Sequence, residues 1–291
     1  MSYMRHVEAC NTKVDEPFLP WWIGETVYGW SRPAFGEILG SFPDVFDVNA
    51  DGIRTSAELK GDELSQRLQR VAATLAEQGL VPALLNEPYP ITAGGREEAV
   101  ARVDRVMAAY LGLRSFGQHL NGYVRQGDRI MMWIARRARD RLIFPGALDN
   151  LVAGGLPVGV SLQDNLRKEC WEEAGMSASL AQKAIPVGAL SYNRVTERGF
   201  RPDVLYCYDL ELPPDFEPVN TDGEVEEFML LPIDEVAEIV HESDDFKLNC
   251  NLVIIDFLVR HGLIGPGDPD YLDIVGGLRA PLGMPSRESR L

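Results

Sequence analysis

The sequence predicts an α+β protein, in which a small α+β N-terminal domain over residues 1–118 precedes a larger mixed-sheet domain over residues 119–265. Three observations favour this organisation. The first part mixes strand-like and helical periodicity, alternating strand patterns begin near residue 119, and a glycine-rich loop with an acidic helix interrupts those strands. Residues 266–291 are rich in Gly and Pro and are expected to be a tail that wraps the surface or frays.

The N-terminal part contains a predicted strand–helix unit and two predicted amphipathic helices. Residues 25–39, ETVYGWSRPAFGEIL, predict a strand and then a helix that opens after Pro33. Residues 62–80 have helical periodicity and end near Gly79. Residues 96–113, REEAVARVDRVMAAYLGL, predict a second, long helix.

An apparent calcium loop at residues 47–58, DVNADGIRTSAE, is better explained as a hairpin. Its spacing fits D-x-[DN]-x-[DN]-G-x5-E, but Pro43 interrupts an entering helix and the sequence contains no partner loop. The tetrapeptide Asn-Ala-Asp-Gly predicts a hairpin turn instead.

The second part alternates predicted strands with one central helix. Residues 122–138 predict two strands across a Gly-Asp turn. Strands are also expected at residues 186–195 and 201–212, with residues 193–201 as a loop between them. Closing helices are expected at residues 233–242 and 248–264.

Charge and composition disfavour several classes of partner. The net charge is −16, and no Lys or Arg occurs between Pro202 and Phe246. Such a surface disfavours nucleic acid, whose binding depends on neutralising phosphates with cations, and it disfavours anionic membranes. No apolar run approaches the ~18 residues that a membrane span needs. The N-terminal residues lack a secretory signal, and four scattered cysteines favour free thiols, so a cytoplasmic protein is expected.

The most informative stretch is residues 154–176, GGLPVGVSLQDNLRKECWEEAGM. Glu169, Glu172 and Glu173 stand at i, i+3 and i+4, so they share one face of a helix. Carboxylates this close repel each other unless a cation lies between them, and Mg²⁺ takes oxygen ligands together with substrate phosphates. The stretch therefore predicts a helix that carries Mg²⁺, with Mn²⁺ as an alternative, for diphosphate chemistry.

Local signals specify this helix. Ser161 with Asp164 three residues later matches a capping box, so the helix should begin near Leu162. Gly175 stands where a left-handed residue commonly ends a helix. The competing interpretation is a solvated acidic helix face. The preceding GGLPVG loop argues against it, because glycines let the backbone approach a phosphate closely.

The same stretch resembles the Nudix box, G-x5-E-x7-R-E-U-x-E-E-x-G-U, in which U is aliphatic. The alignment places Gly154 on the first glycine and the three glutamates on the residues that bind metal in that family. Val160 stands in place of the family's first glutamate, and Lys168 stands in place of its arginine. The resemblance implies a mixed-sheet α/β/α sandwich and a pyrophosphohydrolase that acts on acid anhydrides.

The resemblance covers most of the chain and points to one Nudix subgroup. The strings GWSRPAFGEILGSFPDVF, GALDNLVAGGLPVG and DGEVEEF occur in the order seen in that subgroup, which has its own N-terminal domain and is related to a domain fused to fungal thiamin pyrophosphokinase. This implies hydrolysis of thiamin-type diphosphates, oxidised or damaged, to monophosphates. The alternatives are a hydrolase of a nucleoside diphosphate derivative such as ADP-ribose and, because of Val160 and Lys168, a catalytically weak diphosphate-binding module. A homodimer is a further alternative for the oligomeric state.

The predicted catalytic residues fall into two groups. The resemblance makes the three glutamates both metal ligands and catalytic residues, with Lys168 paired to one of them. Glu224 and Glu226 are the candidates for a general base; the alternative is a strand edge with alternating exposed acids. His119, a lone histidine, is expected to be structural, with a substrate contact as the alternative.

The phosphate-binding side of the site is expected to come from a loop and a basic cluster. Gly154 and Gly155 would shape the loop before the metal helix. Basic residues concentrate at residues 125–141, where Arg136 and Arg137 are expected to bind the substrate diphosphate. The alternative for each arginine is a solvated basic face.

Overall fold

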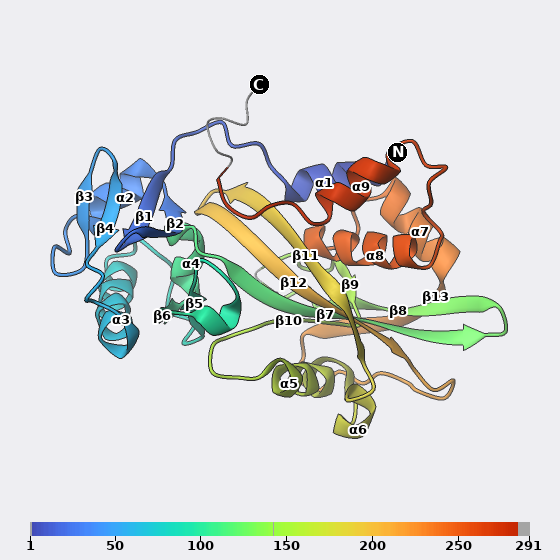
Figure 1. Cartoon of the computed structure of the whole chain (residues 1–291). Helices are drawn as coiled ribbons and strands as arrows, with labels where there is room; N and C mark the ends of the chain where they lie inside the picture. Colours follow the sequence, from blue (N-terminus) through green and yellow to red (C-terminus); the bar gives the residue numbers. More distant parts are fainter. Residues whose placement is uncertain (1, 142, 285–291) are drawn as a thin grey trace.

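The computed structural model describes residues 2–141 and 143–284 and has two regions with separate cores (Figure 1). The N-terminal region is built around a cluster that includes Trp21, Leu68 and Met107. The second region contains a seven-stranded mixed sheet with an apolar cluster against each face. Helices lie on both faces of that sheet, which confirms the expected mixed-sheet sandwich behind a small α+β region.

A four-stranded sheet of order β2-β1-β4-β3 and two helices make up most of the N-terminal region. Its elements are β1 (Leu19–Ile23), β2 (Thr26–Ser31), α2 (Pro33–Leu39), β3 (Asp47–Asn49), β4 (Gly52–Thr55) and α3 (Gly61–Glu77). Pro33 opens α2, a position where its missing N–H costs no helix bond. The predicted hairpin at residues 47–58 is confirmed, because β3 pairs antiparallel with β4 and Asn49 lies opposite Gly52.

The prediction of a long helix over residues 96–113 was wrong. That stretch forms a 3₁₀ turn η1 (Arg96–Glu98), strand β6 (Ala101–Asp104), a second 3₁₀ turn η2 (Arg105–Met107) and a single helical turn α4 (Ala108–Leu111). Strand β6 pairs with β5 (Pro88–Ile91), and the Asp104 carboxylate accepts hydrogen bonds from the Leu85 and Val106 N–H groups. Non-local strand pairing thus overrides the local helical pattern.

The larger sheet has the order β11-β12-β7-β8-β13, with β10 paired to β7 and β9 paired to β8. Its strands are β7 (Ser115–Gln126), β8 (Arg129–Arg137), β9 (Leu148–Asn150), β10 (Val152–Gly155), β11 (Ile185–Thr196), β12 (Gly199–Glu211) and β13 (Val225–Pro232). Strands β7 and β8 pair only near their connecting turn, from Tyr123 to Gln126. Beyond that point β9 and β10 occupy the space between them.

One helix layer contains α5 (Leu162–Ala174) and α6 (Ala178–Ala181), and the opposite layer contains α1 (Met4–Cys10), α7 (Ile233–Glu242), α8 (Leu248–Arg260) and α9 (Tyr271–Gly277) (Figure 1). The N-terminal helix α1 therefore belongs to the core of the second region, where Val7 and Cys10 are buried. The domain limits at residues 118 and 265 stay a prediction.

Two further expectations need correction. The loop expected over residues 193–201 is shorter, because β11 continues to Thr196 and β12 begins at Gly199, opposite it. The tail expected after residue 265 contains α9, whose Ile274 is buried in the core, while residues 285–291 lie outside the described residues. Within the described part of the chain, none of the helices has the length and apolar character required to cross a membrane.

Candidate active site

Helix α5 carries the predicted carboxylates and lies against the larger sheet (Figure 1). At its start, the Ser161 hydroxyl accepts a hydrogen bond from the Asp164 N–H, and at its end Gly175 has a left-handed φ of 62°. Both predicted ends of this helix, Leu162 and Gly175, are confirmed. Buried Leu166 fixes which face of α5 turns toward the sheet.

The three glutamates of α5, which we call the α5 carboxylate row, differ in how far their side chains are exposed to solvent. Glu173 is buried, and its Oε2 accepts a hydrogen bond from the Ala153 N–H at 2.8 Å. Burial, followed by the nearby Asp149 charge, raises the pKa of Glu173 to about 8. The side chain of Glu169 is 14% exposed and that of Glu172 is 36% exposed, and burial also raises the pKa of Glu169. A cation beside these groups would relieve the cost of keeping them ionised.

Gly154 provides the space that Glu169 occupies. A Cβ atom on Gly154 would lie 2.4 Å from Cδ of Glu169, which is closer than any non-bonded contact allows. A side chain at this position would therefore displace the carboxylate. The Nudix-like glycine is explained here by close packing rather than by a left-handed backbone.

Lys168 pairs with two of the carboxylates. Its Nζ lies 2.6 Å from Oε2 of Glu172 and 3.3 Å from Oε1 of Glu169. The Lys168 side chain is 55% exposed, so this contact is screened by solvent and contributes little stability. Lys168 instead holds two negatively charged groups close together on the helix surface.

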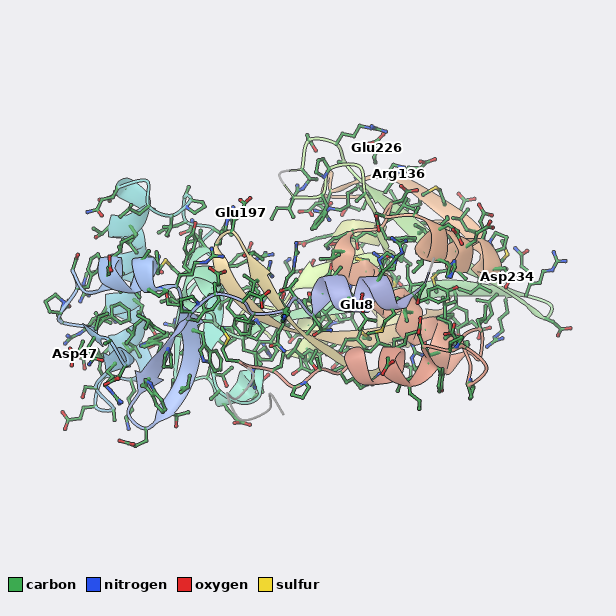
Figure 2. All side chains as sticks on the ribbon, turned by 90° about the horizontal axis from the view of Figure 1, so that it is seen from above. Glu8, Asp47, Arg136, Glu197, Glu226 and Asp234 are labelled. Atoms are coloured by element: carbon green, nitrogen blue, oxygen red, sulfur yellow. The ribbon has the colours of Figure 1, made fainter. Side chains whose placement is uncertain are left out.

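The two candidate bases differ in position. Glu224 accepts a hydrogen bond from Arg141 at 2.6 Å, and its charge is one of the influences that raise the pKa of Glu169, after burial. Glu226 lies 3.4 Å from Arg139 (Figure 2). The structure thus brings Glu224 into the electrostatic neighbourhood of the α5 carboxylates.

The two arginines expected to bind substrate have protein partners. Arg136 donates to the Gly146 carbonyl at 3.1 Å and lies 3.4 Å from Glu227, at the edge of the molecule shown in Figure 2. Arg137, with a side chain only 14% exposed, pairs with Asp149 at 3.2 Å. Neighbouring residues of β8 therefore point their guanidinium groups to different partners. Their role in substrate binding stays a prediction.

A second cluster, which the sequence did not indicate, lies in the interior. Potential ligand atoms of His119, Asp149 and Cys250 all fall within 4.8 Å of one another, and all three residues are buried. The Asp149 carboxylate accepts hydrogen bonds from the Cys250 thiol at 2.6 Å and from Lys247 at 3.2 Å. His119 Nδ1 lies 2.9 Å from Oδ1 of Asn150. We call His119, Asp149 and Cys250 the inner cluster.

Burial sets the charge states in the inner cluster. It lowers the pKa of His119 to about 4, with the Lys247 charge as the second cause. It also raises the pKa of the Cys250 thiol well above its usual value, with Asp149 as the second cause. A neutral imidazole, a protonated thiol and an ion-paired carboxylate therefore satisfy one another. These contacts fit the structural role expected of His119, which stays a prediction.

Comparison with known proteins identifies the family of both regions. A domain of unknown function, DUF4743, matches residues 2–115, and the NUDIX domain matches residues 121–252. Nudix hydrolase 24, chloroplastic, of Arabidopsis thaliana is 42% identical over 283 residues, which are 96% of this chain and 78% of that protein. The chain belongs to the Nudix family. The expected Nudix-family pyrophosphohydrolase with an N-terminal accessory domain is thereby confirmed.

A second curated relative and a solved structure also match this chain. Nudix hydrolase 20, chloroplastic, of Arabidopsis thaliana is 39% identical over 290 residues, covering 96% of this chain and 78% of that protein. Among solved structures, DR0079 from Deinococcus radiodurans has a TM-score of 0.43 and 20% identity, covering 58% of this chain and 98% of that one. That similarity is distant.

The expected cytoplasmic location does not stand. Both Arabidopsis relatives, which match 96% of this Nudix chain, are chloroplastic by name. The expectation rested on the absence of a secretory signal and on scattered cysteines. Neither feature separates the cytoplasm from a plastid.

Proposed function

We propose that this Nudix protein is a Mg²⁺-dependent hydrolase, with Mn²⁺ as a substitute, that converts a thiamin-type diphosphate to its monophosphate and inorganic phosphate. The observation that carries the proposal is the α5 carboxylate row. Glu173 is anchored by the Ala153 N–H, Glu169 packs on Gly154, and Glu172 faces solvent. This arrangement presents hard oxygen donors beside the loop over residues 154–158.

The donor chemistry of the row fits a divalent cation, and the three carboxylates would have to draw together around it, since within the described residues only His119, Asp149 and Cys250 place ligand atoms within 4.8 Å of one another. Glu169, Glu172 and Glu173 offer carboxylate oxygens, the ligand type that Mg²⁺ prefers, and Lys168 counters only part of their charge. A bound Mg²⁺ would polarise the phosphoryl oxygens and lower the pKa of a water for attack on phosphorus. The hydrogen bond from Ala153 would keep the Glu173 carboxylate oriented while the other two groups adjust.

Glu224 is the stronger candidate for moving the proton. It lies in the electrostatic neighbourhood of Glu169, and Arg141 holds its side chain at 2.6 Å. In the proposed reaction, water adds to the terminal phosphorus, the P–O–P bond breaks, and the water proton passes to a carboxylate such as Glu224. Positioning and charge neutralisation contribute most of the acceleration in this class of reaction.

The thiamin-type substrate is inferred from the subgroup strings, which span both regions. The relatives with 42% and 39% identity align with 96% of this chain and support the Nudix family, while their names state no substrate. Since a fold alone does not set the substrate, the choice of substrate requires direct measurement.

The test is phosphate release from a panel of diphosphates with and without Mg²⁺. The panel contains thiamin diphosphate, its oxidised analogues, ADP-ribose and a dinucleoside polyphosphate. Metal-dependent conversion of the thiamin-type members to monophosphates is expected. Preference for ADP-ribose would overturn the substrate, and ligand binding without turnover of any member would make the protein a diphosphate-binding module.

A further inference from the structure

The N-terminal region reaches directly onto the loop before the metal helix. Arg96, in η1, donates from Nη1 to the Pro157 carbonyl at 2.7 Å, and its side chain is only 4% exposed. Burying a guanidinium is costly unless it is hydrogen-bonded, so this contact is a built feature of the interface. It joins the two regions at residue 157, between Gly154 and the start of α5.

A main-chain bond lies next to it. The Val158 N–H donates to the Pro88 carbonyl of β5 at 2.8 Å. Together, Arg96 and Pro88 satisfy consecutive polar groups of the loop, the carbonyl of Pro157 and the N–H of Val158. Backbone groups that are partly withdrawn from water need such partners, and here the N-terminal region supplies them.

The third contact explains Gly155. A Cβ atom on this residue would lie 2.8 Å from the Tyr89 hydroxyl oxygen and 3.4 Å from Nη1 of Arg105. The Arg105 guanidinium lies 5.4 Å from the centroid of the Tyr89 ring and pairs with Glu87 at 2.9 Å. A residue with a side chain would push this packed pair away from the loop.

The opposite side of the same loop is fixed by α5 and by strand β7 of the larger sheet. The Gly155 carbonyl accepts a hydrogen bond from Asn165 of α5 at 3.0 Å, and the Leu156 N–H donates to the Phe116 carbonyl at 3.0 Å. Residues 155–158 are therefore held between the metal helix and sheet on one side and the N-terminal region on the other. Gly154, which accommodates Glu169, directly precedes them.

We propose that the N-terminal region is a clamp for the loop over residues 154–158, with Arg96 as its main positioning residue, so that the domain of unknown function belongs to the catalytic unit. The clamp keeps Gly154 under Glu169 and thereby fixes the carboxylate row. Arg96 acts through the Pro157 backbone and is therefore a positioning residue. The effect on metal binding rests on the proposed function, whereas the effect on the loop does not.

The first test compares Arg96→Met with Arg67→Met in the full chain. Arg67 also donates to a backbone carbonyl, that of Asp44 at 2.7 Å, but within the N-terminal region and away from the loop. Amide hydrogen exchange over residues 154–160 is expected to accelerate at least tenfold in Arg96→Met and to stay at the wild-type rate in Arg67→Met. Unchanged exchange in a folded Arg96→Met protein would overturn the clamp.

Metal binding gives a second readout that does not depend on turnover. The Kd for Mn²⁺, followed by the signal of the free ion, is expected to rise about tenfold in Arg96→Met, since supporting groups around a metal typically change affinity 10- to 100-fold. Arg67→Met should bind Mn²⁺ as the wild type does. An unchanged Kd with faster loop exchange would show that the loop is clamped but does not govern the carboxylates, which overturns that part of the proposal.

A double-mutant cycle keeps the clamp testable if Arg96→Met fails to fold. Gly155→Ala places a methyl group against the Tyr89 hydroxyl, so it should accelerate exchange in the loop. Adding Tyr89→Phe removes the clashing oxygen and should restore most of the protection. Lack of rescue would exclude this interface as the cause. If the wild-type protein hydrolyses no diphosphate, the proposed function fails while the exchange measurements still decide the clamp.

Discussion

The α5 carboxylate row and the inner cluster both gather side chains of the kind that bind metals, yet their surroundings are opposite. The row combines Glu169, Glu172 and Glu173 with Lys168, so negative charge is in excess. The inner cluster has a single carboxylate, Asp149, which is paired with both Lys247 and Arg137. Proximity of ligand-type atoms is therefore not sufficient to indicate a metal site, and the balance of charge separates the two.

Desolvation strengthens the contrast. A cation entering the inner cluster would have to remove the proton from the Cys250 thiol, whose pKa is raised by burial, and compete with the Lys247 ammonium. A cation at the α5 row would also have to displace a proton from buried Glu173, but it meets Glu169 and Glu172, whose side chains are 14% and 36% exposed and have only Lys168 as a cationic partner. We therefore expect the row to bind the metal and the inner cluster to stabilise the fold.

The largest effect should come from Glu172→Gln. Loss of one carboxylate from the row should lower kcat on the order of 100- to 1000-fold, more than the 10- to 100-fold expected for groups that only support a metal. Steady-state kinetics on the best diphosphate would measure it. Glu238→Gln, an exposed glutamate on α7, is the matched control. Wild-type turnover in Glu172→Gln would remove the row from the mechanism.

Lys247→Met should affect stability instead of catalysis. It removes one cation from a buried ion pair, which typically costs about 3–5 kcal/mol of unfolding free energy. Urea unfolding would measure the loss, with Lys13→Met as control because Lys13 pairs with Asp15 at the surface, where such pairs contribute about 0–1 kcal/mol. A loss equal to that of the control would contradict a structural inner cluster.

The metal content of Cys250→Ala sharpens the same comparison. The purified variant should contain as much divalent metal as the wild-type protein. A stoichiometric loss of zinc would make the inner cluster a metal site and reverse the contrast drawn from its charges.

Acid should destabilise the protein through His119. Its pKa falls from 6.5 to about 4 on folding, so between those values the unfolded state binds more protons and stability decreases as pH falls. The full loss is about 3 kcal/mol. Glu173, whose pKa rises to about 8 on folding, has the opposite effect over this pH range, so urea unfolding at pH 7 and at pH 4.5 is compared between the wild type and His119→Gln, which share that glutamate. On going from pH 7 to pH 4.5, the unfolding free energy of the wild type should fall more, or rise less, than that of His119→Gln; an identical change in both proteins would show that His119 does not contribute.

The α5 carboxylate row and the inner cluster also differ in how far the sequence could predict them. Helix α5 was predictable because its signals are local: Ser161 and Asp164 cap its start, Gly175 ends it, and the glutamates follow the helical repeat. Its relation to Gly154 was predictable only as a resemblance, since the packing against Glu169 depends on how β10 lies against the helix.

Non-local features could not be predicted in this way. The inner cluster joins His119 on β7, Asp149 on β9 and Cys250 on α8, and no spacing in the sequence links them. Residues 96–113 have a helical pattern, but pairing of β6 with β5 determines their structure. The contact between the N-terminal region and the loop over residues 154–158 could not be predicted for the same reason, since Arg96 and Pro157 meet only when both regions are folded.

Lys168→Arg should have the smallest effect and tests how charge operates within the row. The ammonium contacts Glu172 and Glu169 as a point charge, whereas a guanidinium fork can hold both carboxylates in a defined geometry. The Kd for Mn²⁺ should therefore fall about two- to fivefold, below the 10- to 100-fold range of a lost supporting group. Lys168→Met, which keeps the bulk but no charge, is the control. A higher Kd for Mn²⁺ in the arginine variant would mean that the guanidinium competes with the metal for Glu172. Positive charge would then oppose metal binding in the row, as it does in the inner cluster.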